Sequence, residues 1–280
     1  MNFFSGRDLF IATKHRKEKV IAPLFTEALG VNCITNPSLD TDSLGTFSGE
    51  VQRPGDPLET IRKKCFLAVE TFQCDLVVAS EGSFGPHPFL PFVAADDELL
   101  MLYDKRNNLE IVVRELSTET NFNAGIINSE KELLEFANSV HFPSHALILK
   151  AAKDDFSWMQ KGIQNEQELV EAFHRINANK KSVYVETDMR AMYNPTRMKV
   201  IETATHKLIS KIKSSCPQCH LPGFDVVEVI PGLRCEVCHC ATNSTLKHKL
   251  QCARCKHTEE LLYPKGKKVE NPMYCDYCNP

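Results

Sequence analysis

The chain has 280 residues, of which 42% are hydrophobic and 25% charged, so it has the composition of a folded protein and the length for one large and one small domain. Its formal net charge of −3 argues against a protein that binds nucleic acid chiefly through excess positive charge, although a local basic face stays compatible with it. No segment has the features of a signal peptide or the length of a membrane span, and we therefore expect a cytoplasmic protein without membrane contact.

Strand-like and helix-like segments alternate through the first third of the chain. Apolar runs bounded by polar residues or glycine predict strands, and apolar residues at helical spacing predict helices. The helix at 56–72 has a clear start, because Asp56 suits the N-cap, Pro57 the first helical position and Glu59 the capping box. The expected elements are strands at 8–13, 31–35 and 74–80, helices at 18–30 and 56–72, and a long polar loop at 36–55.

The apolar strand at 74–80 stops at a carboxylate, Glu81, and the following residues, through Pro88, are typical of a loop. The purely structural interpretation is a strand end followed by an ordinary turn. The alternative is the rim of an active site, because α/β sheets bind their ligands at the carboxyl ends of their strands. Glu81 has no evident local capping role, so it is the first candidate for a catalytic carboxylate.

The later part of the body contains a further set of alternating elements. Two apolar runs at 98–116 flank a polar turn at 105–108 and predict an antiparallel hairpin. The elements expected after it are helices at 129–140, 166–176 and 195–213 and strands at 145–151 and 182–187. Because a hairpin interrupts the alternation, we predict an α/β fold with a mixed central sheet flanked by helices.

Cysteine is concentrated at the end of the chain, where nine of the twelve cysteines follow Ser215. Without an export signal, closely spaced cysteines are more typical of metal binding than of disulfides. A Cys-x-x-Cys turn supplies two corners of a tetrahedral zinc site, and four thiolates leave no position for a catalytic water. The four Cys-x-x-Cys pairs are Cys216 and Cys219, Cys235 and Cys238, Cys252 and Cys255, and Cys275 and Cys278.

These four pairs predict two structural zinc ions. Two zinc ribbons in series, each built from consecutive pairs, are the economical arrangement, and an interleaved pairing of first with third and second with fourth stays open. We therefore predict an α/β domain at 1–213 and a double zinc ribbon at 214–280. The latter range has eight Lys and Arg against seven Asp and Glu, a near balance that disfavours a dedicated nucleic-acid clamp.

The order of motifs from Leu9 to about Leu116 resembles the inosine and xanthosine triphosphatase family, pyrophosphatases of aberrant purine nucleoside triphosphates. The similar segments are "IATKHRKEKV", "GDPLETIRKKC", "DLVVASEGSFG", the hairpin at 98–116 and, later, "ETDMRAMYNPTRMKVIETATHKLI". The resemblance implies an inosine triphosphatase-like fold and Mg²⁺- or Mn²⁺-dependent hydrolysis of nucleoside triphosphates or related phosphate compounds.

The same resemblance selects site residues. Glu59 has a competing role in its capping box, Arg190 and Arg197 could instead pair with nearby carboxylates, and His87 could be an ordinary packed loop residue. The implied catalytic carboxylates are Glu81, Glu59 and Asp42, and the implied phosphate- or substrate-binding residues are Thr13, His15, Lys17, His87, Arg190 and Arg197.

The whole chain, including its cysteine tail at 214–280, also resembles an uncharacterised bacterial family known only as a domain of unknown function. That resemblance implies no activity. The triphosphatases have Asn and Lys where this chain has His15 and Glu18, which favours an alternative function. The alternative is a non-catalytic zinc-binding protein whose tail docks on nucleic acid or a protein partner.

Overall fold

A computed structural model describes residues 3–39, 55–178 and 182–280. The chain divides into two compact units, one formed by residues 1–106 and 112–208 and the other by residues 107–111 and 209–280. Asp42, which the sequence analysis selected as a catalytic carboxylate, lies outside the described residues. None of the helices in the described ranges is long and apolar enough to cross a membrane.

The larger unit contains a five-stranded mixed sheet. Its strand order is β2-β1-β3-β4-β5, with β1 parallel to both β2 and β3, and β3 antiparallel to β4. The mixed α/β sheet predicted from the hairpin is therefore confirmed. The strands are β1 (Asp8–Ala12), β2 (Asn32–Ile34), β3 (Leu76–His87), β4 (Leu90–Asp104) and β5 (Leu109–Ser117).

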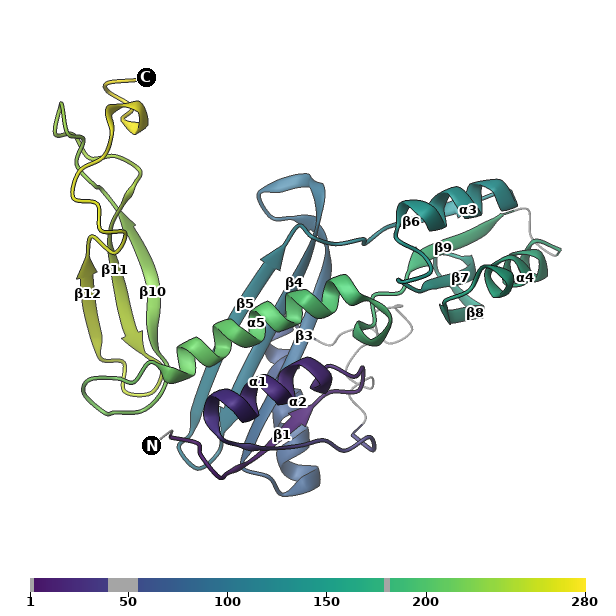
Figure 1. Ribbon diagram of the computed structural model, residues 1–280, viewed down its shortest axis with the longest axis horizontal. Coiled ribbons are helices and arrows are strands. Elements are labelled where there is room, and N and C mark those ends of the chain that lie inside the picture. The colour runs from purple at the N-terminus through teal and green to yellow at the C-terminus, as the bar shows by residue number, and fades with distance from the viewer. Residues whose placement is uncertain (1–2, 40–54, 179–181) are drawn as a thin grey trace. The chain divides into compact units, whose positions relative to one another are not determined.

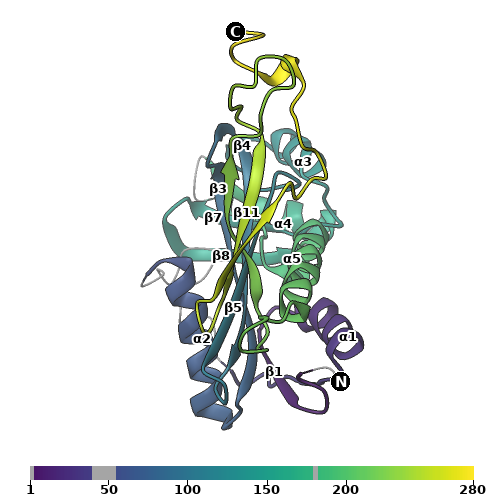
Figure 2. The same cartoon turned by 90° about the vertical axis from the view of Figure 1, so that its left-hand side faces the viewer.

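Helices cover both faces of this sheet, as Figure 2 shows, with α1 (Glu18–Leu29) and α5 (Pro195–Lys213) on one face and α2 (Pro57–Phe72) on the other. Side chains alternate between the faces along each strand. Val77 and Ala79 therefore point towards α2, where Ile61 and Cys65 complete an apolar core. The predicted start of α2 is confirmed, because the Asp56 side chain accepts a hydrogen bond from the backbone N–H of Glu59.

The prediction of a loop after Ser80 is wrong. Strand β3 continues through Glu81 to His87 and pairs with β4 over its whole length, so that Gly82 lies opposite Glu98. Glycine and proline disfavour a strand in isolation, and the local pattern therefore predicted a loop. The hydrogen bonds to β4 outweigh that preference, because the hairpin satisfies the backbone groups that a loop would expose to water.

A separate four-stranded antiparallel sheet follows in the same unit, with α3 (Glu130–Ser139) and α4 (Glu166–Asn177) packed on it (Figure 1). Leu133, Leu149 and Phe173 are buried in its core. The sequence pattern predicts two of these strands but not β6, which is short, or β8, which is largely polar. In spatial order the strands are β6 (Ala124–Ile127), β9 (Val183–Thr187), β7 (Leu147–Ala152) and β8 (Asp155–Ile163).

The smaller unit contains a three-stranded antiparallel sheet of β10 (Phe224–Pro231), β11 (Thr245–Cys252) and β12 (Thr258–Leu262). Phe224 at the start of β10 pairs with Cys252 at the end of β11. The first Cys-x-x-Cys turn therefore meets the third at one end of this hairpin, while the second turn follows the other end of β10.

Candidate functional site

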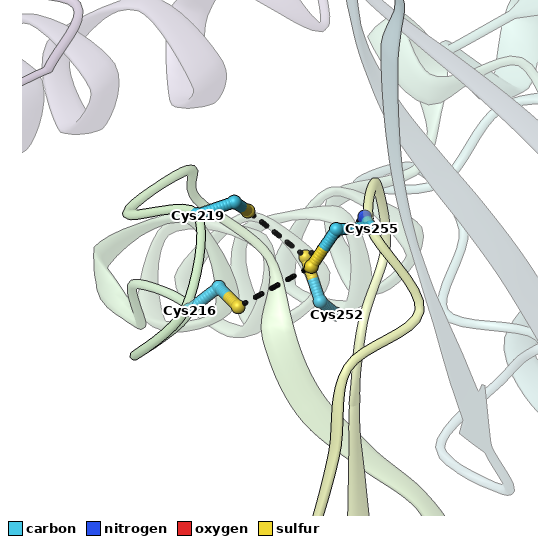
Figure 3. A group of neighbouring side chains, drawn as sticks. All are labelled: Cys216, Cys219, Cys252 and Cys255. Carbon is cyan, nitrogen blue, oxygen red and sulfur yellow. Dashed lines mark hydrogen bonds between the residues drawn. The ribbon is translucent and has the colours of Figure 1, made fainter.

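Two groups of four cysteines lie in the smaller unit, and within each group the Sγ atoms all lie within 4.8 Å of one another. Figure 3 shows the first group, in which Cys216 and Cys219 face Cys252 and Cys255. The Sγ atoms of Cys216 and Cys255 are 3.6 Å apart. A tetrahedral site with Zn–S bonds of about 2.3 Å requires sulfur atoms about 3.8 Å apart, so the group has the size of a metal site.

The second group consists of Cys235, Cys238, Cys275 and Cys278. The pairing is thus interleaved, and the pairing in series favoured by the sequence analysis is wrong. The physical reason is the antiparallel β10–β11 hairpin. Its register places the start of β10 beside the end of β11, so the first Cys-x-x-Cys turn meets the third and not the second. Sequence spacing alone treats neighbouring turns as partners and does not contain that register.

Backbone hydrogen bonds lower the pKa of one thiol in the second group, which favours the thiolate form that binds a cation. The amides of Cys238 and Val237 donate to the Sγ of Cys235 and lower the pKa of this thiol to about 7. Proton sharing with Cys238 raises the pKa of Cys278 to about 12. Four sulfurs at this spacing cannot all ionise without a compensating cation, and a tetrahedral metal ion supplies that compensation.

A second site lies in the larger unit, where β1 ends. The chain leaves β1 through α1 to reach β2 on one side, and returns through α2 to reach β3 on the other side. Such a reversal of strand order is where open α/β sheets bind their ligands. Ala12 at the end of β1 pairs with Ala79, so the next residues of β3, from Ser80 to Gly82, extend past the end of β1.

Charged side chains are buried close together at this point, where the charges of Glu98, Arg197 and Lys17 act on Asp96. We call Lys17, Ser80, Asp96, Glu98 and Arg197 the ionic cluster, and each is at most 4% exposed. The Lys17 Nζ donates to the Ser80 Oγ at 2.8 Å and lies 3.9 Å from the Glu98 Oε2. The Arg197 Nε donates to the Glu98 Oε1 at 2.6 Å.

Burial and mutual charge shift the proton affinities within the ionic cluster. Burial, reinforced by nearby Arg197, lowers the pKa of Lys17 to about 7. Burial also opposes ionisation of Glu98, but attraction to Arg197 and Lys17 outweighs it and holds the pKa of Glu98 below its ordinary range. Burial and the Glu98 charge raise the pKa of Asp96 to about 8. Such shifts are typical of functional sites.

Glu81, the first sequence candidate, lies beside the ionic cluster but points to the α2 face. Its carboxylate pairs with Lys64 of α2, and Lys64 also donates to the backbone oxygen of Ser80. Both Glu81 and Lys64 contribute to the electrostatic environment of Lys17. The structure therefore brings Glu81, Lys17 and Arg197 to one region, with Glu81 in an ion pair that the sequence did not indicate.

The other selected residues have separate surroundings. Thr13 and His15 are half-buried between β1 and α1, and Glu59 is exposed. The His87 Nδ1 accepts a hydrogen bond from the Phe89 backbone N–H. Among the described residues, groups of three or more His, Cys, Asp or Glu ligand atoms within 4.8 Å are confined to the two cysteine sets, so Glu59 and Glu81 belong to no such group.

Arg190 forms a bidentate contact with Asp188, with N–O distances of 2.9 and 2.6 Å, and lies over the ring of Tyr193. This is the pairing that the sequence analysis weighed against a phosphate-binding role. Arg197 differs, because it is 1% exposed and lies in the ionic cluster.

Sequence reasoning missed Asp96 and Glu98. Two signals were present in the chain: three consecutive acidic residues at 96–98, directly before the apolar run at 99–102, and Gly82 in the facing strand. A glycine inside a strand often marks a close approach of other groups. Here a Cβ at position 82 would clash with the Arg197 guanidinium and the Glu98 carboxylate.

The fold and the two sites define an α/β protein with a buried ionic cluster in its body and two four-cysteine groups at its C-terminal end. The chain belongs to the family described as domain of unknown function (DUF6671), whose model matches residues 64–280. The predicted resemblance to an uncharacterised family is thereby confirmed. The matched range contains Asp96, Glu98, Arg197 and all eight paired cysteines, whereas Lys17 precedes it. No curated protein matches the chain.

Proposed function

We propose that the protein is a metal-dependent hydrolase of nucleoside triphosphates or related phosphate compounds. The observation that carries this proposal is the burial of Lys17 and Arg197 beside two carboxylates, Asp96 and Glu98, where the strand order reverses. Hydrolysis of a phosphate anhydride needs cations to neutralise the substrate, carboxylates to hold Mg²⁺ or Mn²⁺, and an attacking water. The ionic cluster combines the first two in one place.

Each residue has a role in this proposal. Lys17 is the N-cap residue of α1, at the end of the helix whose dipole favours an anion. Arg197 is held by the Glu98 Oε1 and by the backbone oxygen of Met189, and its guanidinium lies 5.1 Å from the centre of the Phe84 ring. These three contacts fix the orientation of the Arg197 side chain, whose guanidinium is suited to phosphate oxygens.

A hydrolysis screen tests the proposal. Purified full-length protein would be incubated with nucleoside triphosphates and diphosphates in the presence of Mg²⁺ or Mn²⁺, and released phosphate and pyrophosphate measured. Lys17→Gln should reduce turnover by about a hundredfold or more, since it removes a positive charge that would stabilise the transition state. Lys19→Gln is the matched control, because Lys19 is exposed two residues away. If no compound yields product with either Mg²⁺ or Mn²⁺, the proposal of a hydrolase is refuted.

We also infer that each four-cysteine group binds one structural zinc ion. Four thiolate ligands select zinc over hard cations such as Mg²⁺, and they leave no coordination position for substrate. The ions would contribute folding free energy to a unit too small to depend on an apolar core alone. Elemental analysis of protein purified without added metal should find two zinc ions per chain, and one or none would contradict this assignment.

A second candidate function is the non-catalytic docking protein. The observation in its favour is the exposure of large apolar side chains in the smaller unit, including Val229 at 56% and Leu261 at 50%. Apolar exposure of this kind is more typical of protein partners than of nucleic acid. The hydrolysis screen separates the two functions, because a docking protein would release no product with any compound.

A further inference from the structure

Asp96 and Glu98 are both 0% exposed, on the same side of β4. Within the described residues, neither oxygen of Asp96 has a hydrogen-bond partner, and the Oε2 of Glu98 has none either. The Glu98 Oε1 is held by Arg197. Three carboxylate oxygen atoms therefore lie buried in one cluster without donors.

Burial of such oxygen atoms without compensation is strongly unfavourable. A proton on Asp96 alone would not resolve this, because one O–H can donate to at most one other oxygen atom, and the second Asp96 oxygen would stay buried without a donor. Lys17 reaches only one edge of the cluster, with its Nζ 3.9 Å from the Glu98 Oε2. A further cation between the two carboxylates would compensate all three oxygen atoms at once.

We propose that Asp96 and Glu98 bind one divalent cation of the Mg²⁺ or Mn²⁺ class. Oxygen-only ligands favour these hard ions over zinc, and such ions commonly take one or two carboxylates, with water or phosphate oxygens completing the shell. The inference deepens the proposed function by assigning its metal to residues other than Glu81, Glu59 and Asp42. It rests on that function only for the role of the ion in hydrolysis, because binding itself needs no substrate.

The charges at the site define what would bind together with the ion. Asp96 and Glu98, when ionised, balance Lys17 and Arg197, so a divalent cation would give the cluster a net charge of about +2. A cluster with that charge attracts a polyanion. The cation and a phosphate substrate are therefore expected to strengthen each other's binding, as linked ligands do.

The test is a titration of zinc-loaded full-length protein with Mn²⁺, with free Mn²⁺ measured by electron paramagnetic resonance. We expect one Mn²⁺ ion to bind per chain, and Asp96→Asn to weaken its affinity at least tenfold. Asp97→Asn is the matched control, because Asp97 pairs with the exposed Arg114 and lies on the opposite side of the strand. Asp97→Asn should leave Mn²⁺ binding unchanged.

A second measurement keeps the test independent of the variant's folding. In wild-type protein, bound Mn²⁺ should first broaden the backbone amide signals of Gly82 and Phe84, which pair with Glu98 and Asp96. No Mn²⁺ binding at millimolar concentration, or broadening that begins elsewhere, would overturn the proposal. Mn²⁺ binding that depends on Asp96, in a protein that hydrolyses no phosphate compound, would support the cation site and reject the hydrolase. If the protein hydrolyses a phosphate compound but Asp96→Asn leaves its Mn²⁺ affinity unchanged, the hydrolase is supported and the cation site at Asp96 and Glu98 is rejected.

Discussion

At the scale of single residues, Gly82 shows how a missing side chain makes room for a buried ion pair. It lies opposite Glu98, and a Cβ at this position would come 2.9 Å from the Glu98 Cδ and overlap the Arg197 guanidinium. We therefore expect Gly82→Ala to reduce the free energy of unfolding by about 1–3 kcal/mol, the usual cost of overpacking. Denaturant unfolding of the purified variant measures this change.

Gly85 is the control for this substitution because it lies on the same strand, and a Cβ there would meet no atom within 4 Å. Gly85→Ala should leave stability within about 0.5 kcal/mol of wild type. Equal destabilisation by both substitutions would show that strand conformation, rather than the Arg197–Glu98 pair, sets the requirement at position 82.

At the scale of elements, the β10–β11 hairpin decides which cysteines lie in the same four-cysteine group. In the interleaved arrangement, Cys235 and Cys275 belong to one group and Cys216 to the other. The double substitution Cys235→Ser with Cys275→Ser should therefore remove one metal ion per chain and leave the other. Elemental analysis of the purified variant measures the number retained.

The converse pair provides the control for the metal count. Cys216→Ser together with Cys235→Ser should remove both ions, because these two cysteines belong to different groups. Pairing in series predicts the opposite result for each double variant. Loss of both ions from the first variant and of one from the second would reject the interleaved arrangement.

His145, two residues before β7, contacts the first turn of α5. Its Nε2 lies 2.9 Å from the Thr196 Oγ1 and its Nδ1 lies 2.9 Å from the Ser144 Oγ. Burial, reinforced by nearby His141, lowers the pKa of His145 below its ordinary value. The unfolded chain then binds this proton more readily than the folded chain, so the stabilising contribution is complete above about pH 6.5 and is lost as pH falls towards the folded pKa.

His145→Gln should therefore lose less stability than wild type between pH 7 and about pH 5, because it removes the group that acid protonates on unfolding. Thermal melts at several pH values test this. His174→Gln is the control, since His174 is an exposed side chain paired with Glu130. An unchanged pH dependence in His145→Gln would exclude His145 as the source of acid sensitivity.

At the scale of the whole molecule, the proposed zinc ions and the apolar cores would stabilise different units. The single tryptophan, Trp158, packs against the core of the four-stranded sheet in the larger unit. Removal of metal with a strong chelator should unfold the smaller unit, whose two cysteine groups would then lack a cation. Trp158 fluorescence should stay unchanged, whereas the calorimetric unfolding profile should show one transition in place of two.

Addition of zinc after chelation should restore the lost transition, which is the control for irreversible damage. A shift of the Trp158 emission that follows metal loss at the same rate would mean that the larger unit also depends on the metal. In that case the two units would not be independent in stability.

The sequence by itself determined those features that depend on neighbouring residues. The N-cap of α2 at Asp56, the hairpin turn near 105–108 and the capacity of the Cys-x-x-Cys turns to form four-sulfur groups of metal-site size all follow from local chemistry, and the structure has each of them. Local preference predicted a loop after Ser80, whereas pairing with β4 extended the strand. Strand register is a property of two segments together, so neither segment alone contained it.

Only the tertiary structure decided which distant residues share a site. Lys17, Glu98 and Arg197 come from three parts of the chain and meet because β3 and β4 pair and α5 packs on one face of their sheet. The cysteine turns likewise meet across a hairpin rather than along the chain. A sequence pattern records which groups can ionise or bind metal, but their proton affinities and partners depend on burial and distance, which exist only after folding.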